Sequence, residues 1–470
     1  MKVNSNRKGK IILKVLVTLL ALVVAAGIIL ACYYLIKPAY GEVETVTVGN
    51  SKTLTVGVIS DTQLPNKEPE DGNNKYKEHT EKALQLFKNQ GVDVIVFAGD
   101  FSDLASRYSY GTYNEVFNKV FADDKPETVY IMGNHDNWYP TDYASVAPKE
   151  RLYKKCMGES PWVHKVINGF HFIGVSPDLT QNTSGYSQKT LDWMDEQIAL
   201  AQKDTPEGYP IFVITHHSPQ NTVYGSDDWY DPGLDKVLSK YENVVSISGH
   251  SHYSLMDERS IYQYNYTAIQ TQSLAYIEQE KGKFDAFKAE LSSIPPKADD
   301  YPFAIIMKVG EDKTTVERWN VLDGKEEKAD SRWSLDYPLD KSNFKYGYYT
   351  RLHETTAPVF KETEIQYVQN ICSLEDESKT LPGISFSAAV DDDVVQSYEI
   401  NLEKDTGEKY TYTVFSDYYM GKENMQDNVK IALDSNLEAG RYSVTVYAVD
   451  SFNHYSENCA VGTIEIKRRS

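Results

Sequence analysis

The feature that most constrains the fold is a set of short apolar runs, each followed at once by polar residues. Continuous apolar runs of this length are typical of strands that are buried on both faces of a sheet. The runs are LTVGVIS (54–60), VDVIVFAG (92–99), TVYIMG (128–133), PIFVITHH (210–217) and VVSISGH (244–250). Because buried strands need covering layers, they predict an α/β domain.

Segments with helical spacing lie between the strand-like runs. They cover residues 77–91, 113–122, 187–204 and 231–241. Two further strand-like runs flank Asn168-Gly169, which is a hairpin signal. Later strand-like runs extend the predicted α/β domain over residues 54–322. A connecting segment over 323–356 shows no clear pattern.

The pattern changes at about residue 357. Short runs such as VQSYEINLE and RYSVTVYAVD alternate apolar and polar residues and are divided by turn residues. This alternation is typical of an all-β sandwich. We therefore predict a second domain over 357–470, a β-sandwich similar to immunoglobulin or fibronectin type III domains.

The N-terminus predicts a membrane anchor. Residues 1–14 carry five basic residues and no acid, and residues 15–36 carry no charge. Such a segment is long enough to cross a bilayer as a transmembrane helix, and the basic residues before it indicate a cytoplasmic N-terminus. A linker over 37–53 would then lead to a catalytic domain outside the cytoplasm. A cleaved signal peptide and a lipoprotein signal at Cys32 are alternatives with the same outward location.

Charge and cysteine content exclude two classes of site. The net charge is −20, with no long basic run beyond the N-terminus, so nucleic-acid binding is not expected. The four cysteines contain no CxxC pair, which argues against a thiolate zinc site. Cys372 and Cys459 fall in one predicted domain and either form a disulfide or remain free thiols.

Five polar motifs follow the predicted strands. They are Asp61-Thr62-Gln63, Gly99-Asp100, Gly133-Asn134-His135-Asp136, Thr215-His216-His217 and Gly249-His250-Ser251-His252. Each motif alone is more often a turn or a helix cap. Together they predict one site, because ligands of open α/β sheets bind at the carboxyl ends of the strands.

The residue types in these motifs suit a pair of divalent metal ions. Carboxylate and amide oxygens with imidazole nitrogens are ligands for Mn, Fe or Zn. A carboxylate at a strand end, such as Asp100, can bridge two ions. A metal pair lowers the pKa of bound water and stabilises charge on a phosphoryl group.

The order of the motifs resembles the calcineurin-like metallophosphoesterase superfamily over residues 54–322. The resemblance implies a four-layer α/β/β/α sandwich and hydrolysis of phosphomonoesters, phosphodiesters or pyrophosphates by a hydroxide that bridges the metals. It also implies two ligand sets. The first metal would be held by Asp61, Gln63, Asp100 and His252, and the second by Asp100, Asn134, His216 and His250.

The resemblance further assigns His135 and Asp136 to catalysis. His135 would protonate the leaving oxygen or contact the phosphate, and Asp136 would orient His135. Gln63 departs from the commonest pattern, in which His stands at this position, and this leaves the identity of the metal open.

Two further positions bear on the ligand set. Adjacent strand residues face opposite ways, so one of His216 and His217 is expected to be the ligand. His216 is favoured, and the His-x-Pro spacing to Pro219 keeps His217 as an alternative. Asp103 lies where purple acid phosphatases, which resemble this domain, place Tyr. A ferric-tyrosinate site is therefore not expected.

Substrate choice is expected to depend on the loops at 64–78, 101–112, 178–187 and 218–230. The alternative function is a surface ligand-binding protein, in which the β-sandwich binds a cell-wall or surface ligand and the α/β domain is only a scaffold. The nearly complete set of ligand positions favours an enzyme with a phosphoester substrate.

Overall fold

The computed structural model describes residues 14–20, 22–24, 43–49, 52–122, 124–138, 147–178, 185–285, 291–372, 380–421, 424–434 and 436–467. Residues 43–470 form one compact unit, and the N-terminal residues form another. In the N-terminal unit the described residues are helical, while the rest of the predicted transmembrane segment 15–36 lies outside the described residues. Within the described part of the chain, no helix has the length and apolar character needed to cross a membrane.

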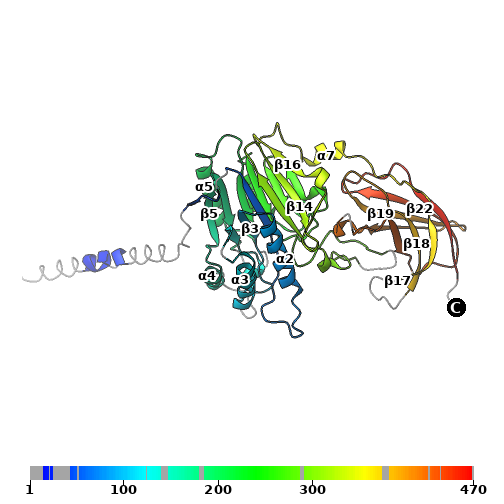
Figure 1. The fold of residues 1–470 in the computed structure, drawn as a ribbon, viewed down its shortest axis with the longest axis horizontal. Coiled ribbons are helices and arrows are strands. Elements are labelled where there is room, and N and C mark those ends of the chain that lie inside the picture. Colours follow the sequence, from blue (N-terminus) through cyan, green and yellow to red (C-terminus); the bar gives the residue numbers. More distant parts are fainter. Residues whose placement is uncertain are drawn as a thin grey trace, which may run out of the picture. The chain divides into compact units, whose positions relative to one another are not determined.

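Two sheets of seven hydrogen-bonded strands each form the framework of the α/β region (Figure 1). The first sheet has the order β1 (Glu44–Val46), β5 (Trp162–Ile167), β6 (Phe170–Val175), β7 (Ile211–Thr215), β10 (Val244–Ser248), β12 (Thr267–Gln270) and β11 (Ile261–Gln263). The second has the order β15 (Lys325–Glu327), β14 (Lys313–Asn320), β13 (Phe303–Val309), β2 (Leu54–Ile59), β3 (Val94–Ala98) and β4 (Glu127–Ile131), and β16 (Trp333–Asp336) pairs with β14.

The sheets pack face to face over one apolar core. Val56 and Val96 of the second sheet join Phe212 and Val245 of the first in a single buried cluster. Because successive side chains of a strand point to opposite faces, alternate residues such as Ile95 lie on the other side, in a second cluster with helix residues. This alternation explains the continuous apolar runs, since both faces of each strand are covered.

Helices cover the outer faces of both sheets. The second sheet carries α2 (Lys75–Asn89), α3 (Arg107–Phe121) and α4 (Ala147–Met157), whose apolar side chains fill the outer cluster. The first sheet carries α5 (Gln188–Ala201) with α6 (Pro232–Leu238) beside it. The predicted α/β fold is confirmed, with the α/β/β/α layer order.

Helix α3 begins earlier than the sequence pattern predicts. It starts at Arg107 rather than near residue 113, and Ser106 caps it by accepting a hydrogen bond from the Ser109 amide at 3.0 Å. Its first turns contain Tyr, Ser and Gly, which are weak helix formers. The cap and the burial of Tyr110 and Tyr113 compensate for this low propensity.

The connecting segment adds to the α/β framework. Strands β15 and β16 both pair with β14, and α7 (Tyr348–Glu354) follows. The predicted boundary at residue 322 therefore lies inside a continuous sheet.

The C-terminal region is all-β, as predicted. One sheet has the order β17 (Gln366–Cys372), β18 (Thr380–Ser387) and β21 (Asn428–Ala432), and the other has β20 (Lys409–Phe415), β19 (Val395–Lys404), β22 (Gly440–Asp450) and β23 (Ala460–Ile466). Side chains from both sheets share one core. We call this region the C-terminal sandwich. Cys372 and Cys459 are free thiols, so the disulfide alternative does not hold.

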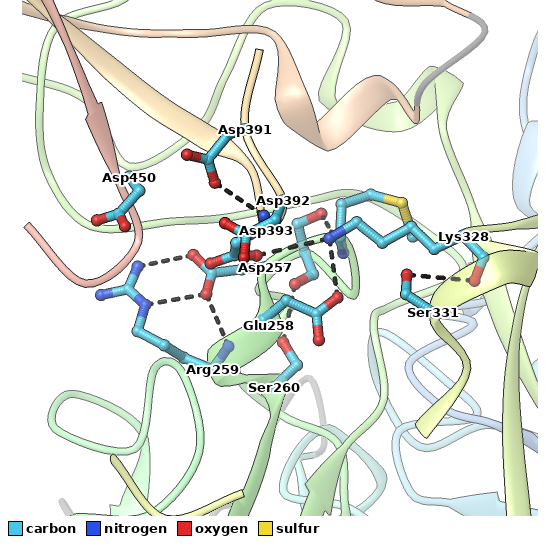
Figure 2. A network of polar contacts seen from close by, with 12 residues as sticks. Asp257, Glu258, Arg259, Ser260, Lys328, Ser331, Asp391, Asp392, Asp393 and Asp450 are labelled. Carbon is cyan, nitrogen blue, oxygen red and sulfur yellow. Dashed lines mark hydrogen bonds and ion pairs between the residues drawn. The ribbon is translucent and has the colours of Figure 1, made fainter. Parts of the chain in front are cut away.

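Glu258 is the centre of a buried charge network that reaches the C-terminal sandwich (Figure 2). Its carboxylate accepts hydrogen bonds from Arg318 at 2.7 Å and Lys328 at 2.8 Å, and from Arg351 at 3.1 Å. Lys328 also lies 3.5 Å from Asp393 of the sandwich. Burial alone would raise the pKa of Glu258, but these cations hold it well below its usual range.

We predict that Glu258→Gln destabilises the protein, because it leaves several buried cations without their counter-charge. Breaking a buried ion network from one side costs about 3–5 kcal/mol. The free energy of unfolding in urea measures this loss. Glu354→Gln, at an exposed position on α7, is the matched control. Equal unfolding free energies for the two variants would contradict the prediction.

Candidate metal centre

The predicted ligands lie at the carboxyl ends of parallel strands. Asp61 follows β2, Asp100 follows β3, and Asn134 follows β4, and these three strands are parallel neighbours. In the other sheet, His216 follows β7 and His250 follows its parallel neighbour β10. The structure therefore brings the five motifs together where two sheet edges meet.

Most of the predicted ligand residues have left-handed backbones. Positive φ angles occur at Asp61 (52°), Gln63 (45°), Asp100 (59°), His250 (70°) and His252 (59°). This conformation costs a residue with a side chain roughly 1–2 kcal/mol. Clustered strain of this kind is typical of functional sites, where the surrounding structure holds it in place.

The glycines of the motifs are explained by close approach of the ligands. A Cβ atom at Gly133 would lie 2.0 Å from Asp100 Oδ1, and one at Gly249 would lie 2.6 Å from Asp61 Oδ2. Any larger residue would displace a carboxylate. The Gly in GNHD and GHSH is therefore required by the site and not only by the turn.

His216 directs its Nε2 atom at two oxygens. Its Nδ1 donates to the Ala98 carbonyl at 2.8 Å, which leaves Nε2 as the lone-pair nitrogen of the neutral ring. This Nε2 lies 2.8 Å from Asn134 Oδ1 and 3.2 Å from Asp100 Oδ2. Three lone-pair atoms that face one another need a shared cation or a proton.

His252 and Asp61 repeat this arrangement. The Nδ1 atom of His252 donates to the Tyr276 carbonyl at 3.0 Å, so its Nε2 carries the lone pair. That nitrogen lies 3.3 Å from Asp61 Oδ1, a buried oxygen without a hydrogen-bond partner. The other oxygen of Asp61 accepts from the His250 amide at 3.1 Å. The backbone carbonyls that fix each ring are the outer partners that metal-binding histidines require.

The donor set fits a metal centre. Ligand atoms of Asp100, His216 and His250 lie within 4.8 Å of one another. Gln63 is also present, with its Nε2 donating to Asp100 Oδ2 at 3.1 Å. Rotation of this amide by half a turn would present its oxygen as a ligand instead. Carboxylate, amide and imidazole donors are together suited to divalent transition metals.

Charge at the site also favours a cation. Burial alone would raise the pKa of Asp100, but His216 and His135 hold it below its usual range. Burial alone would lower the pKa of His216, yet Asp100 raises it to about 9. The buried carboxylate thus requires a positive partner, and either a proton or a metal ion satisfies it.

His217 lies differently from His216. Burial and the neighbouring His216 lower its pKa to about 3. Its ring packs at a tilt against His250 with centroids 4.2 Å apart and meets Tyr186 edge to face. Among the described residues, the cluster of close ligand atoms around Asp100 contains His216 and does not contain His217. This favours His216 as the ligand.

His135 is oriented by a partner that differs from the predicted one. Its Nδ1 donates to the Asp103 carbonyl at 2.9 Å, and its ring packs on Trp138 with centroids 3.9 Å apart. Asp136 accepts instead from the backbone amides of Phe101 and Gly133 and from Ser102 and Tyr110. Asp136 therefore holds the loops around the site, and the predicted contact with the His135 ring is not formed.

Several contributing residues were not predicted from the sequence. The Tyr186 hydroxyl accepts from the His216 amide at 2.8 Å. Ser273 donates to the Asp61 carbonyl at 3.0 Å, and the Tyr276 carbonyl binds His252. Trp229 lies edge-on to His250 at 5.2 Å. The polar segment after β12 follows a strand end, which was an available signal, but it contains no His or Asp.

A family model for the calcineurin-like phosphoesterases matches residues 54–254. Residues 54–254 are therefore similar to the calcineurin-like phosphoesterases, and this match spans less than half of the chain. The domain is similar to a cAMP/cGMP dual specificity phosphodiesterase of Mycobacterium tuberculosis, with 25% identity over 173 residues, or 34% of this chain. The chain spans about half of that relative, 49% of its length. The family match and this relative support a metal-dependent hydrolase.

Solved structures also resemble the chain. A dimetal phosphatase from Danio rerio shares 11% identity and covers 60% of this chain and 99% of its own, with a TM-score of 0.40. The purple acid phosphatase PPD1 from yellow lupin shares 13% identity and covers 61% of this chain and 54% of its own, with a TM-score of 0.39.

We predict that His216→Asn weakens Mn²⁺ binding at least tenfold, because it removes the nitrogen that faces Asp100 and Asn134. His217→Asn is the matched control and is expected to bind Mn²⁺ within about threefold of the wild type. Isothermal titration calorimetry measures both affinities. If His217→Asn loses binding and His216→Asn keeps it, the ligand assignment is reversed.

Proposed function

We propose that the chain is a membrane-anchored phosphoesterase that uses two divalent metal ions and acts outside the cytoplasm. Its substrates would be phosphomonoesters, phosphodiesters or pyrophosphates. The observation that carries the proposal is the convergence of lone pairs from Asp61, Asp100, Asn134, His216 and His252 at strand ends, with both histidine rings held by backbone carbonyls. Mn, Fe and Zn all suit such donors.

The protein residues supply binding, orientation and proton transfer. When bound, the metal ions would lower the pKa of water and offset the charge of the phosphoryl group. Burial alone would lower the pKa of His135, but the carboxylates of Asp100 and Asp103 raise it to about 9. The Asp103 carbonyl accepts a hydrogen bond from Nδ1 of His135 and orients the ring, and we propose that protonated His135 gives a proton to the leaving oxygen.

Phosphodiesters are the first substrate class to test. The mycobacterial relative is a cyclic nucleotide phosphodiesterase, and its match supports diester chemistry for this domain. A pure binding scaffold, the alternative function, would gain nothing from a buried carboxylate and several left-handed residues, since both features reduce stability. The alternative therefore has less support.

The location rests on the N-terminal sequence. Residues 15–36 carry no charge and follow a basic segment, which supports a single transmembrane helix with residues 1–14 in the cytoplasm. The C-terminal sandwich, which we propose to be immunoglobulin-like or fibronectin type III-like, would then face the same compartment as the catalytic domain. A cell-wall or surface ligand for it belongs to the same proposal.

We predict that the purified full chain hydrolyses bis-p-nitrophenyl phosphate with Mn²⁺ and loses this activity in EDTA. Asn134→Ala and His250→Ala should each reduce kcat/KM by at least 100-fold, since each removes a metal ligand. His353→Ala, at an exposed position on α7, is the control and should be unaffected. Turnover that survives in both ligand variants would show that the proposed centre is not the catalytic one.

We predict that protease added to intact cells removes the catalytic domain and the C-terminal sandwich. An antibody against residues 1–14 should still detect a protected N-terminal fragment in the membrane fraction. A cytoplasmic protein of the same cells serves as the lysis control. Complete protection of the chain would contradict the proposed topology.

A further inference from the structure

We propose that the C-terminal sandwich is a working part of the phosphoesterase. In this proposal Tyr418 is a positioning residue that acts through Tyr224 on loop 218–230, which carries Trp229 to the metal centre. The proposal rests on the proposed function, because it names residues that position the substrate of that site. It differs from the view of the sandwich as a separate ligand-binding module.

Trp229 lies at the metal-facing part of the loop. Its ring meets the ring of His250, a predicted ligand, edge to face at 5.2 Å. The side chain remains 39% exposed, although apolar side chains of this size usually gain stability from burial. An exposed indole beside a ligand can pack against the group that a bound phosphoester carries.

Tyr224 fixes the other part of the same loop. The residue is 4% exposed, and its amide donates to the Arg259 carbonyl at 2.9 Å. Its ring packs against Tyr253 with centroids 4.6 Å apart, and the Arg259 guanidinium lies 4.2 Å from its centre. Trp229 follows this anchor after four intervening residues, and the Trp229 amide donates to the Gly225 carbonyl at 2.9 Å. Movement of Tyr224 is therefore transmitted to the indole.

The sandwich contacts this anchor directly. The Tyr224 hydroxyl donates to Glu280 at 2.7 Å and lies 3.1 Å from the hydroxyl of Tyr418. Tyr418 is fully buried and follows β20 in the sandwich. Gln396 of β19 donates to the same Glu280 oxygen at 3.0 Å. Two side chains of the sandwich, Tyr418 and Gln396, are therefore hydrogen-bonded to the Tyr224–Glu280 pair that holds the loop.

Other contacts keep the sandwich attached without the Tyr418 hydroxyl. The Phe415 amide donates to the Lys283 carbonyl at 2.8 Å, and the Tyr419 hydroxyl donates to the Pro296 carbonyl at 2.9 Å. Asp393 lies 3.5 Å from Lys328 (Figure 2). Loss of one hydroxyl at Tyr418 should therefore loosen the loop and leave the sandwich in place.

The test compares two buried tyrosines of the sandwich. Tyr418→Phe removes the hydroxyl that reaches Tyr224, and the matched control Tyr442→Phe removes one that donates to the Glu438 carbonyl within the sandwich. One hydrogen bond is worth about 1 kcal/mol, so KM for bis-p-nitrophenyl phosphate should rise about fivefold in Tyr418→Phe. The value of kcat should change less than twofold, because the metal ligands are not altered.

Hydrogen–deuterium exchange gives a readout that does not need activity. The peptide over residues 219–231 should exchange faster in Tyr418→Phe than in the wild type and the control. Trp229→Ala should reproduce the rise in KM, and Trp229→Phe should restore part of it.

The outcomes separate the two proposals. Wild-type exchange in residues 219–231 together with wild-type KM in Tyr418→Phe would overturn the positioning role, as would equal effects in the Tyr442→Phe control. A wild-type chain that hydrolyses nothing would defeat the proposed function. The exchange comparison would still decide whether the sandwich holds the loop.

Discussion

The charge of Asp100 is the constraint on which the α/β region depends. This carboxylate is completely buried at the end of β3. Its negative charge is paired with the His216 ring, which follows a strand of the other sheet. Asp61 and His252 make a second pairing between the same two sheets. The candidate metal centre is therefore also a polar contact between two layers that share an apolar core. Because a buried charge is costly without a partner, the relative placement of the sheets and the chemistry of the site cannot vary independently.

The strands and the ligand positions were predictable because one physical fact determines both. A strand covered on two faces is continuously apolar, and its polar successors must lie at the sheet edge. The beginnings of helices were less predictable, as α3 shows, because the Ser106 cap and burial outweigh weak propensity.

The partners of the ligands were not predictable. The carbonyls of Ala98, Asp103 and Tyr276 orient three site histidines, and every residue has a carbonyl group. Only the folded backbone decides which of them reaches an imidazole. The prediction that Asp136 orients His135 illustrates this. Asp136 is next to His135 in the sequence, but the His135 ring donates to the Asp103 carbonyl. Sequence periodicity likewise separated the C-terminal sandwich from the α/β domain but gave no sign of the Glu258 network or of Tyr418.

The position of β2 has a consequence for biosynthesis. This strand carries Asp61 and pairs with β3 on one edge and with the much later β13 on the other. Chains are made from the N-terminus, so one edge of β2 stays open until Phe303–Val309 has been synthesised. An open apolar edge is a site of mispairing between chains. The nascent chain therefore exposes an unpaired edge of β2 while the residues between β2 and β13 are synthesised. Chaperones or rapid completion of the chain would limit mispairing at this edge.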